Sequence, residues 1–163
     1  MKRIGLLSDT HGYIHPRATD FFSDCHEIWH AGDIGNIETL ELLKNIKPTR
    51  AVYGNIDGAS LRNDLSEFEI FTIEGLKVLI IHIGGYPGRY EKQVKNLLDK
   101  HNPDLFISGH SHILKVIPDK NKNLLHINPG AAGNIGFHKV KTLVKFEINN
   151  GVVQEMEIFE SER

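Results

Sequence analysis

Short apolar runs that end in polar loops dominate the first third of the chain. The runs at residues 4–7, 27–30 and 50–53 have the length and composition of buried strands. Each is followed by a loop that contains Asp or Asn, and amphipathic segments separate the runs. This order of strand, loop and helix predicts a parallel sheet with crossover helices.

Two helices are expected between these strands. Pro16 occupies a position where proline favours the start of a helix, which we expect to continue to about residue 23. Asn36 can cap a second helix, which Pro48 ends. Helical spacing predicts that four apolar residues of this second helix face the core: Ile37, Leu40, Leu42 and Leu43.

The second half of the chain is mostly β in its pattern. Residues 67–73 and 77–82 flank Glu74-Gly75 and predict a hairpin, which is followed by a helix at residues 91–100. Further strands are expected at residues 105–108, 113–117, 124–128, 139–148 and 152–159. An Asn-Gly turn joins the last two of them. The pattern as a whole predicts two sheets with helices outside them.

Polar residues with ligand chemistry follow five of the predicted strands. Asp9, Asp33 and Asn55 lie beyond the carboxyl ends of the first three. His82 ends the hairpin, and Gly109-His110-Ser111-His112 follows the strand at residues 105–108. Ligand sites in open α/β sheets lie beyond the carboxyl ends of strands, so we expect these residues to form one site.

The donor atoms of this site suit two divalent cations. Asp-x-His and His-x-His place alternate side chains on one side of an extended chain. The set has carboxylate, amide and imidazole groups and no cysteine, which argues against a structural thiolate zinc site. The seven candidate ligands are Asp9, His11, Asp33, Asn55, His82, His110 and His112.

Length, charge and cysteine content narrow the function further. The 163 residues predict a single domain spanning residues 1–163. A formal net charge of −2 gives no basis for stable nucleic-acid binding, and the single cysteine excludes an intrachain disulfide. No segment has the pattern of a signal peptide or a transmembrane helix, so we expect a cytoplasmic protein without membrane contact.

The chain resembles the calcineurin-like metallophosphoesterases, and in particular their small bacterial and archaeal phosphodiesterase subfamily. The resemblance implies an α/β fold, namely a four-layer αββα sandwich of two mixed β-sheets flanked by helices. It spans essentially the whole chain and rests on motifs in the order of the family: Asp9-Thr10-His11, Gly32-Asp33, Gly54-Asn55-Ile56-Asp57, His82, Gly109-His110-Ser111-His112 and Asn128-Pro129-Gly130-Ala131.

The resemblance also implies a division of the ligands. Asp9, His11 and His112 would bind one metal. Asn55, His82 and His110 would bind the other, and Asp33 would bridge the two. A metal-bridging hydroxide would then attack the phosphorus atom. Mn²⁺ is the first expectation for the metals, and Ni²⁺, Zn²⁺ and Fe suit the same donors.

Four residues are expected to take part in catalysis: Asp33, Asn55, Asp57 and His110. Asn55 and His110 would also bind the substrate, and Asp57 would support the site from behind the ligands. Many family members have a histidine at the position of Ile56, where it helps to protonate the leaving group. Ile56 cannot do so, and the candidates for that role are His15, His138 and Tyr86.

Three histidines outside the ligand set lie in or near predicted strands. His30 and His126 have apolar neighbours, so we expect both to be packed or hydrogen-bonded within the sheets. For His138, structural and functional roles remain open.

Hydrolysis of a small phosphodiester is the function that these observations favour. A phosphomonoesterase of the same fold is the nearest alternative, and a nuclease is disfavoured by the lack of basic charge. A protein-interaction scaffold like the small retromer subunit is a third possibility, but some ligands are replaced there and all seven are present here. Related small members associate, so a homo-oligomer is compatible with the sequence.

Overall fold

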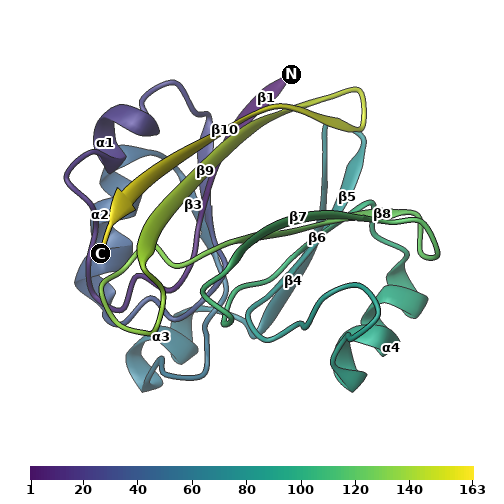
Figure 1. Ribbon diagram of the computed structural model, residues 1–163, viewed down its shortest axis with the longest axis horizontal. Coiled ribbons are helices and arrows are strands. Elements are labelled where there is room, and N and C mark those ends of the chain that lie inside the picture. The colour runs from purple at the N-terminus through teal and green to yellow at the C-terminus, as the bar shows by residue number, and fades with distance from the viewer.

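Two five-stranded mixed β-sheets pack face to face in the computed structural model, which describes residues 1–163 (Figure 1). The first sheet has the order β10-β9-β1-β2-β3. Its strands are β1 (Lys2–Leu7), β2 (Glu27–His30), β3 (Thr49–Ala51), β9 (Val140–Asn149) and β10 (Val152–Glu162). Strands β1, β2 and β3 are parallel, as the sequence predicted, and β9 pairs antiparallel with both β1 and β10.

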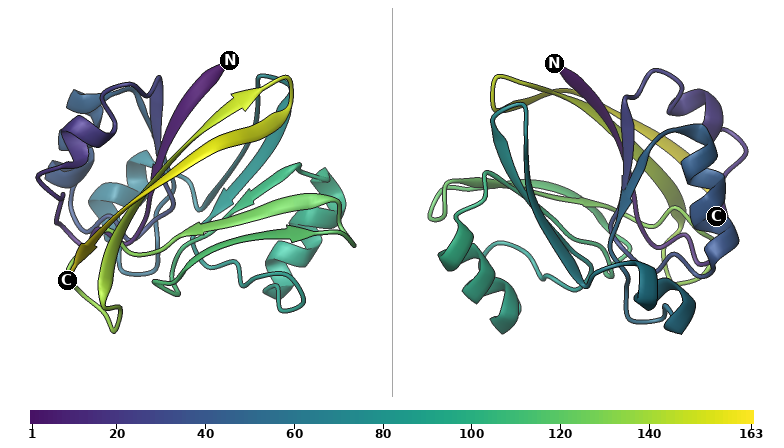
Figure 2. Two further views of the ribbon diagram at one scale, coloured as in Figure 1. Left: turned by 45° about the horizontal axis from the view of Figure 1, so that its top comes forward. Right: turned by 180° about the vertical axis from the view of Figure 1, so that it is seen from behind.

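The second sheet has the order β4-β5-β6-β8-β7. Its strands are β4 (Phe68–Ile73), β5 (Leu76–Ile81), β6 (Leu105–Ile107), β7 (Leu114–Asp119) and β8 (Leu124–Pro129). Strands β5, β6 and β8 are parallel, and β4 and β7 pair antiparallel at the two edges. The two sheets can be followed separately in the views of Figure 2.

Helices cover the outer faces of both sheets, which gives the αββα order of layers that was predicted. The four helices are α1 (Ala18–Phe21), α2 (Ile37–Ile46), α3 (Ala59–Asp64) and α4 (Lys92–His101). Helices α1 and α2 lie outside the first sheet, and α4 lies outside the second (Figure 1). None of the four is long and apolar enough to cross a membrane.

Alternation along the strands divides the apolar residues among the layers. In β5, Val78 and Ile80 face the core between the sheets, whereas Leu79 and Ile81 face α4. The largest side chain between the sheets is Trp29 of β2, which is fully buried. Burial of each large apolar side chain stabilises the fold by about 1.5–3 kcal/mol.

Two predictions about the helices need correction, and one helix was not predicted. Leu42 is 54% exposed rather than buried, because α2 packs through the narrower stripe that contains Leu40 and Leu43. Helix α1 has only four residues; Arg17 gives no side-chain cap at its start. Helix α3 was not predicted, because its six residues include a single buried apolar side chain, Leu61.

The carboxyl ends of parallel strands from both sheets meet at one edge of the sandwich. Beyond β1 and β2, the amide of Asp9 donates to the carbonyl of Gly32 (2.9 Å). Beyond β5 and β6, the amide of Gly109 donates to the carbonyl of His82 (2.9 Å). The amide of His110 then donates to the carboxylate of Asp9 (3.1 Å), which ties one sheet to the other. This edge carries the candidate site.

His126 of β8 is a buried structural histidine, as expected. Its ring stacks on Phe106 with 4.9 Å between centroids, and its Nδ1 lies 3.1 Å from the Phe106 carbonyl oxygen, to which it can donate. Burial lowers the pKa of His126 to about 4. The folded protein therefore keeps this ring neutral at pH values where an unfolded chain protonates it.

This difference predicts that His126 contributes to acid destabilisation. Between pH 6.5 and about 4 the unfolded chain binds the extra proton, so the free energy of unfolding falls as the pH falls, by up to about 1.4 kcal/mol per pH unit from this group. The substitution His126→Gln keeps a donor and does not titrate. Urea unfolding at pH 7.5 and pH 5 with EDTA should show a smaller loss in the variant, and an equal loss would contradict the assignment.

Candidate metal centre

Two buried aspartates form the middle of the site, and each has one oxygen committed to the protein. Asp9 Oδ2 accepts from the Ser8 hydroxyl (2.7 Å) and from the backbone N–H of His110 (3.1 Å). Asp33 Oδ1 accepts from the backbone N–H of Ile56 (3.0 Å). The remaining oxygens, Asp9 Oδ1 and Asp33 Oδ2, face the histidines.

The histidines gather around these two oxygens in two groups. In the first group, Asp9 Oδ1 lies 3.2 Å from His112 Nε2 and 3.9 Å from His11 Nε2. In the second, Asp33 Oδ2 lies 3.2 Å from His82 Nε2, and His110 completes the group. One donor atom from each member lies within 4.8 Å of the others in both groups.

Asp33 connects the two groups through a single oxygen. Its Oδ2 lies 3.6 Å from His11 Nε2 of the first group and 3.2 Å from His82 Nε2 of the second. Asp9 Oδ1 also faces both groups, at 3.2 Å from His112 Nε2 and 3.7 Å from His82 Nε2. The free oxygens of both aspartates therefore lie between the two groups of histidines.

Several donor atoms of the centre have no hydrogen-bond partner although they are buried. They are Asp9 Oδ1, His11 Nε2 and His82 Nε2. An unsatisfied buried polar atom costs about 1–3 kcal/mol, so their convergence on one space needs an explanation. Oxygen and imidazole donors at these separations fit the divalent cations that suit mixed N and O sites.

The carboxylates and imidazoles of the centre stabilise one another's charged forms. Burial alone would raise the pKa of both aspartates, but His112 and His82 hold the pKa of Asp9 and Asp33 below their ordinary range. Burial likewise acts to lower the pKa of His82, yet the carboxylates of Asp33 and Asp9 raise it above the usual value. The aspartates are therefore anionic at neutral pH, as cation ligands must be.

A backbone contact aims His82 at the centre. Its Nδ1 lies 2.8 Å from the carbonyl oxygen of Ala31, which can only accept a hydrogen bond. Nδ1 therefore carries a proton, and when the ring is neutral the lone pair of Nε2 points toward Asp33. Outer contacts of this kind orient metal-binding histidines in many proteins.

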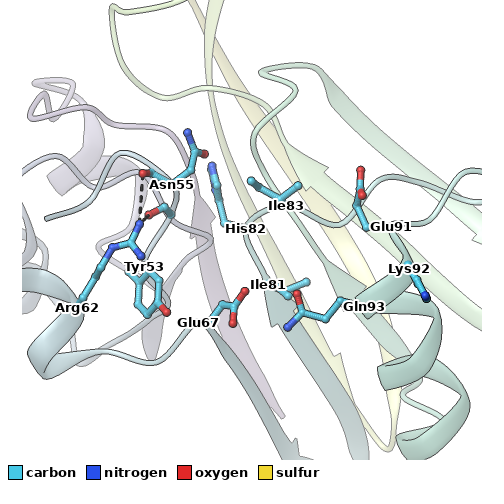
Figure 3. A pocket seen from close by; sticks show the side chains of 11 residues that line it. Tyr53, Asn55, Arg62, Glu67, Ile81, His82, Ile83, Glu91, Lys92 and Gln93 are labelled. Atoms are coloured by element: carbon cyan, nitrogen blue, oxygen red, sulfur yellow. Dashed lines mark hydrogen bonds between the residues drawn. The ribbon is translucent and has the colours of Figure 1, made fainter. Parts of the chain in front are cut away.

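Asn55 lies at the edge of the centre, where it is exposed to solvent. It lines a hollow of about 420 Å³ that also contains His82 (Figure 3). The guanidinium carbon of Arg62 lies 4.5 Å from the centre of the Tyr53 ring. The same guanidinium donates to the carbonyls of Gly54 and Asn55 (3.3 Å each). The guanidinium thus holds the loop that presents Asn55, a role that the sequence analysis missed.

Asp57 supports the loops and does not face the ligands. Its Oδ2 accepts from the backbone N–H of Gly54 (2.8 Å) and of Ile34 (3.1 Å), and its Oδ1 accepts from that of Gly35 (2.8 Å). Asp57 therefore ties the loop of Asn55 to the loop of Asp33. Both oxygens of Asp57 thus accept from backbone amides of the two loops, and neither is turned toward the histidines.

Asn128 supports the other pair of histidines. Its amide nitrogen donates to the carbonyl of Gly109 (2.9 Å) and to the hydroxyl of Ser111 (3.0 Å). This fixes the loop that carries His110 and His112. The motif that begins at Asn128 is the sequence signal for this contact.

A second hollow, of about 340 Å³, opens beside this loop. Its lining includes His110 and His112 together with the exposed side chains of Ile113 and Phe137. It has no lining residue in common with the hollow beside Asn55. Candidate ligands thus border both hollows, and the ring of His82 in one lies 5.4 Å from the ring of His110 in the other.

Five of the seven candidate ligands have a left-handed backbone. Only ten non-glycine residues of the chain have a positive φ, so half of them are candidate ligands. This finding corrects the extended backbone that the sequence analysis assumed for Asp-x-His and His-x-His, whose two histidines His110 and His112 fall in different groups. The five are Asp9 (53°), His11 (46°), Asp33 (56°), His110 (71°) and His112 (62°).

The three side chains proposed as proton donors have other contacts. His15 packs on Phe159 and its Nδ1 accepts from the amide of Arg17. Both nitrogens of His138 have partners. Lys115 lies 4.3 Å above the ring of Tyr86.

His30 is buried and hydrogen-bonded, as the sequence analysis expected. Its Nδ1 accepts from the amide of Gly32 (3.0 Å), so the ring proton lies on Nε2. That nitrogen donates to the Thr10 hydroxyl (2.9 Å), which in turn donates to the carbonyl of Ile34 (2.9 Å). His30 thereby joins the loops that carry the two aspartates.

Relatives of known fold share this architecture. An archaeal phosphodiesterase superposes with a TM-score of 0.76 at 22% identity, over 98% of this chain and 99% of that one. Vps29 of Entamoeba histolytica, solved in complex with zinc, superposes with a TM-score of 0.73 at 18% identity, over 98% of each chain. At these identities the likeness establishes the fold alone.

Sequence comparison identifies the family. A probable metallophosphoesterase of Methanocaldococcus jannaschii is 35% identical over 134 residues, which cover 78% of this chain and 67% of that protein. Another, of Methanothermobacter thermautotrophicus, is 32% identical over 137 residues, which cover 78% and 76% respectively. The family model of the calcineurin-like phosphoesterase superfamily domain matches residues 1–151. The family binds divalent metals, in keeping with the two groups of donors, and this chain belongs to the calcineurin-like phosphoesterase superfamily.

Proposed function

We propose that the protein is a metal-dependent phosphodiesterase that hydrolyses a small phosphodiester. The observation that carries this proposal is the free oxygen of Asp33, which faces both groups of histidines from one buried position. Two divalent cations, with Mn²⁺ as our first choice, would supply Lewis acidity and activate a water molecule. The proposed ligands are Asp9, His11, Asp33, Asn55, His82, His110 and His112.

Exposure divides the proposed ligands into those that hold the centre and those that meet the substrate. Asp9, Asp33 and His82 are buried, whereas Asn55 and His110 are exposed at its edge. The exposed pair can approach the phosphoryl oxygens of a substrate while the buried residues cannot. The Asp9 contact to the amide of His110 holds one of this pair in place.

The two hollows favour a diester over a monoester. One is bordered by Asn55 and His82 and the other by His110 and His112, so each of two ester groups has its own space. A monoester has a single ester group and would leave one space unused. In the larger hollow, Arg62 is occupied by backbone carbonyls, and Lys92 is accompanied by Glu67 and Glu91. The side chains of this hollow thus form no cationic cluster that would select a dianionic monoester.

The absence of a proton donor at Ile56 limits the leaving group. Ile56 is 47% exposed at the edge of the centre, and its backbone N–H is held by Asp33. No imidazole can protonate a departing alkoxide from this position. We therefore expect the enzyme to act best on diesters whose leaving alcohol is acidic enough to depart without an acid catalyst.

Backbone strain argues for a catalytic centre over an interaction scaffold. Each non-glycine residue in the left-handed region costs about 1–2 kcal/mol. A protein that served only to bind partners would gain nothing from five such residues around buried, unpaired donors. Such strain persists where ligand geometry matters more than stability.

This strain can be measured at His11, whose φ is 46°. Glycine adopts this conformation without penalty and alanine does not, so metal-free His11→Gly should be more stable than His11→Ala by about 1 kcal/mol. Urea unfolding measures the difference. Asn55, which lacks a positive φ, is the control: there alanine should be the more stable substitution. The same order at both positions would contradict the strain argument.

The proposed activity is tested with metal-stripped protein that is titrated with Mn²⁺, Ni²⁺ or Zn²⁺. Turnover of bis(p-nitrophenyl) phosphate should return with metal and exceed that of p-nitrophenyl phosphate, because the diester can fill both hollows. Asp33→Asn should lower diester turnover by at least about a hundredfold, since it removes the shared ligand. Asp99→Asn, on the exposed face of α4, should leave turnover unchanged.

Each outcome of this assay discriminates between functions. A preference for the monoester would favour the phosphomonoesterase alternative. Full turnover by Asp33→Asn would contradict a metal centre that shares this ligand. A wild-type protein that binds no metal would favour the protein-interaction scaffold over an enzyme.

A further inference from the structure

His138 makes two contacts that together define where its proton lies. Its Nε2 is 2.7 Å from the carbonyl oxygen of Gly133, and its Nδ1 is 3.1 Å from Nδ1 of His112. The two imidazole rings meet edge to face, with centroids 5.0 Å apart. His138 thus stands directly behind a proposed metal ligand.

The carbonyl of Gly133 determines the direction of the second hydrogen bond. A carbonyl oxygen can only accept, so Nε2 of His138 carries the proton. The neutral ring then has a lone pair on Nδ1, and the contact between the two Nδ1 atoms requires His112 to donate. With a proton on Nδ1 of His112, the neutral form of that ring has its lone pair on Nε2, which lies 3.2 Å from Asp9 Oδ1.

Asp9 itself anchors this chain of contacts. The backbone N–H of Gly133 donates to the carbonyl of Asp9 (3.1 Å), which places the Gly133 carbonyl in front of His138. These contacts form a closed ring. Asp9 holds Gly133, Gly133 orients His138, His138 orients His112, and His112 contacts the Asp9 carboxylate. A disturbance at His138 should therefore be felt at the ligand.

Gly136 closes the space around the contact between the histidines. Its φ is +135°, and a Cβ at this residue would lie 2.2 Å from His112 Nδ1 and 3.0 Å from His138 Nδ1. The backbone thus packs directly against the hydrogen bond and leaves no room for a side chain. This packing limits the other orientations that the two rings could adopt.

We infer that His138 is a positioning residue, which accepts a hydrogen bond from Nδ1 of His112 and so presents Nε2 of His112 to a divalent cation. The inference rests on the proposed function, because it assigns His112 as a ligand. It gives His138 the task that the carbonyl of Ala31 performs for His82. It also removes His138 from the candidates for proton donor, since both of its nitrogens are engaged.

Two substitutions separate the hydrogen bond from the bulk of the ring. His138→Leu keeps a side chain of similar size and removes the acceptor, whereas His138→Asn can place its carbonyl oxygen near the position of Nδ1. In the leucine variant, one Zn²⁺ should bind about ten- to a hundredfold more weakly, and asparagine should restore most of the loss. Competition with a chromophoric chelator, without substrate, measures the affinities. His101→Leu, at the end of α4, is the matched control and should bind two Zn²⁺ like the wild type.

A spectroscopic measurement reports the protons directly. In the Zn²⁺-loaded wild type, long-range ¹H–¹⁵N correlation should place the His112 ring proton on Nδ1 and the His138 ring proton on Nε2. A His112 proton on Nε2, or a His138 proton on Nδ1, would overturn the inference. Urea unfolding of the metal-free variants shows whether weaker Zn²⁺ binding only reflects a less stable fold. In that case, Zn²⁺ affinity and the free energy of unfolding should fall together in His138→Asn and His138→Leu.

The outcomes distinguish this inference from the proposed function. If the wild type binds two Zn²⁺ and His138→Leu binds them equally well, the positioning role is wrong and the metal centre stands. If the wild type binds no Zn²⁺, the proposed function fails, and the inference fails with it.

Discussion

The proposed bridging role of Asp33 requires that the surrounding structure fix the position of its carboxylate. One oxygen is held by the amide of Ile56, and the other is left free between His11 and His82. Asp57 in turn ties the loop of Ile56 to the loop of Asp33 through three backbone amides. The rest of the sandwich serves this arrangement, since parallel strands of both sheets deliver their ends to the same edge.

Hydrogen bonds outside the centre determine which nitrogen of each histidine carries a proton. His82 is oriented by a backbone carbonyl and His112 by the ring of His138. Both contacts leave Nε2 available toward the aspartates. The Nδ1 atoms of these histidines therefore have hydrogen-bond partners, whereas Asp9 Oδ1 and His82 Nε2, which face the centre, have none. Cation binding requires this distribution of hydrogen bonds.

Much of this organisation could be predicted from the sequence because it depends on periodicity and on strand ends. The runs that became β1 and β2 are apolar and end in polar loops, so the meeting of Asp9 with Asp33 followed from sheet topology. Other features depend on tertiary packing. The exposure of Leu42 reflects how closely α2 approaches the sheet, and the left-handed backbone of the ligands reflects how loops from two sheets are forced together. The partner of His112 lies 26 residues away, and no local pattern connects the two.

The central claim is that loops from two sheets build one centre for two cations that share Asp33. Anomalous diffraction from crystals grown with Mn²⁺ tests it most directly. The account predicts two anomalous peaks about 3.5–4 Å apart, one beside Asp9, His11 and His112 and the other beside Asn55, His82 and His110, with Asp33 Oδ2 between them. A single peak, or two peaks of which only one contacts Asp33, would contradict it.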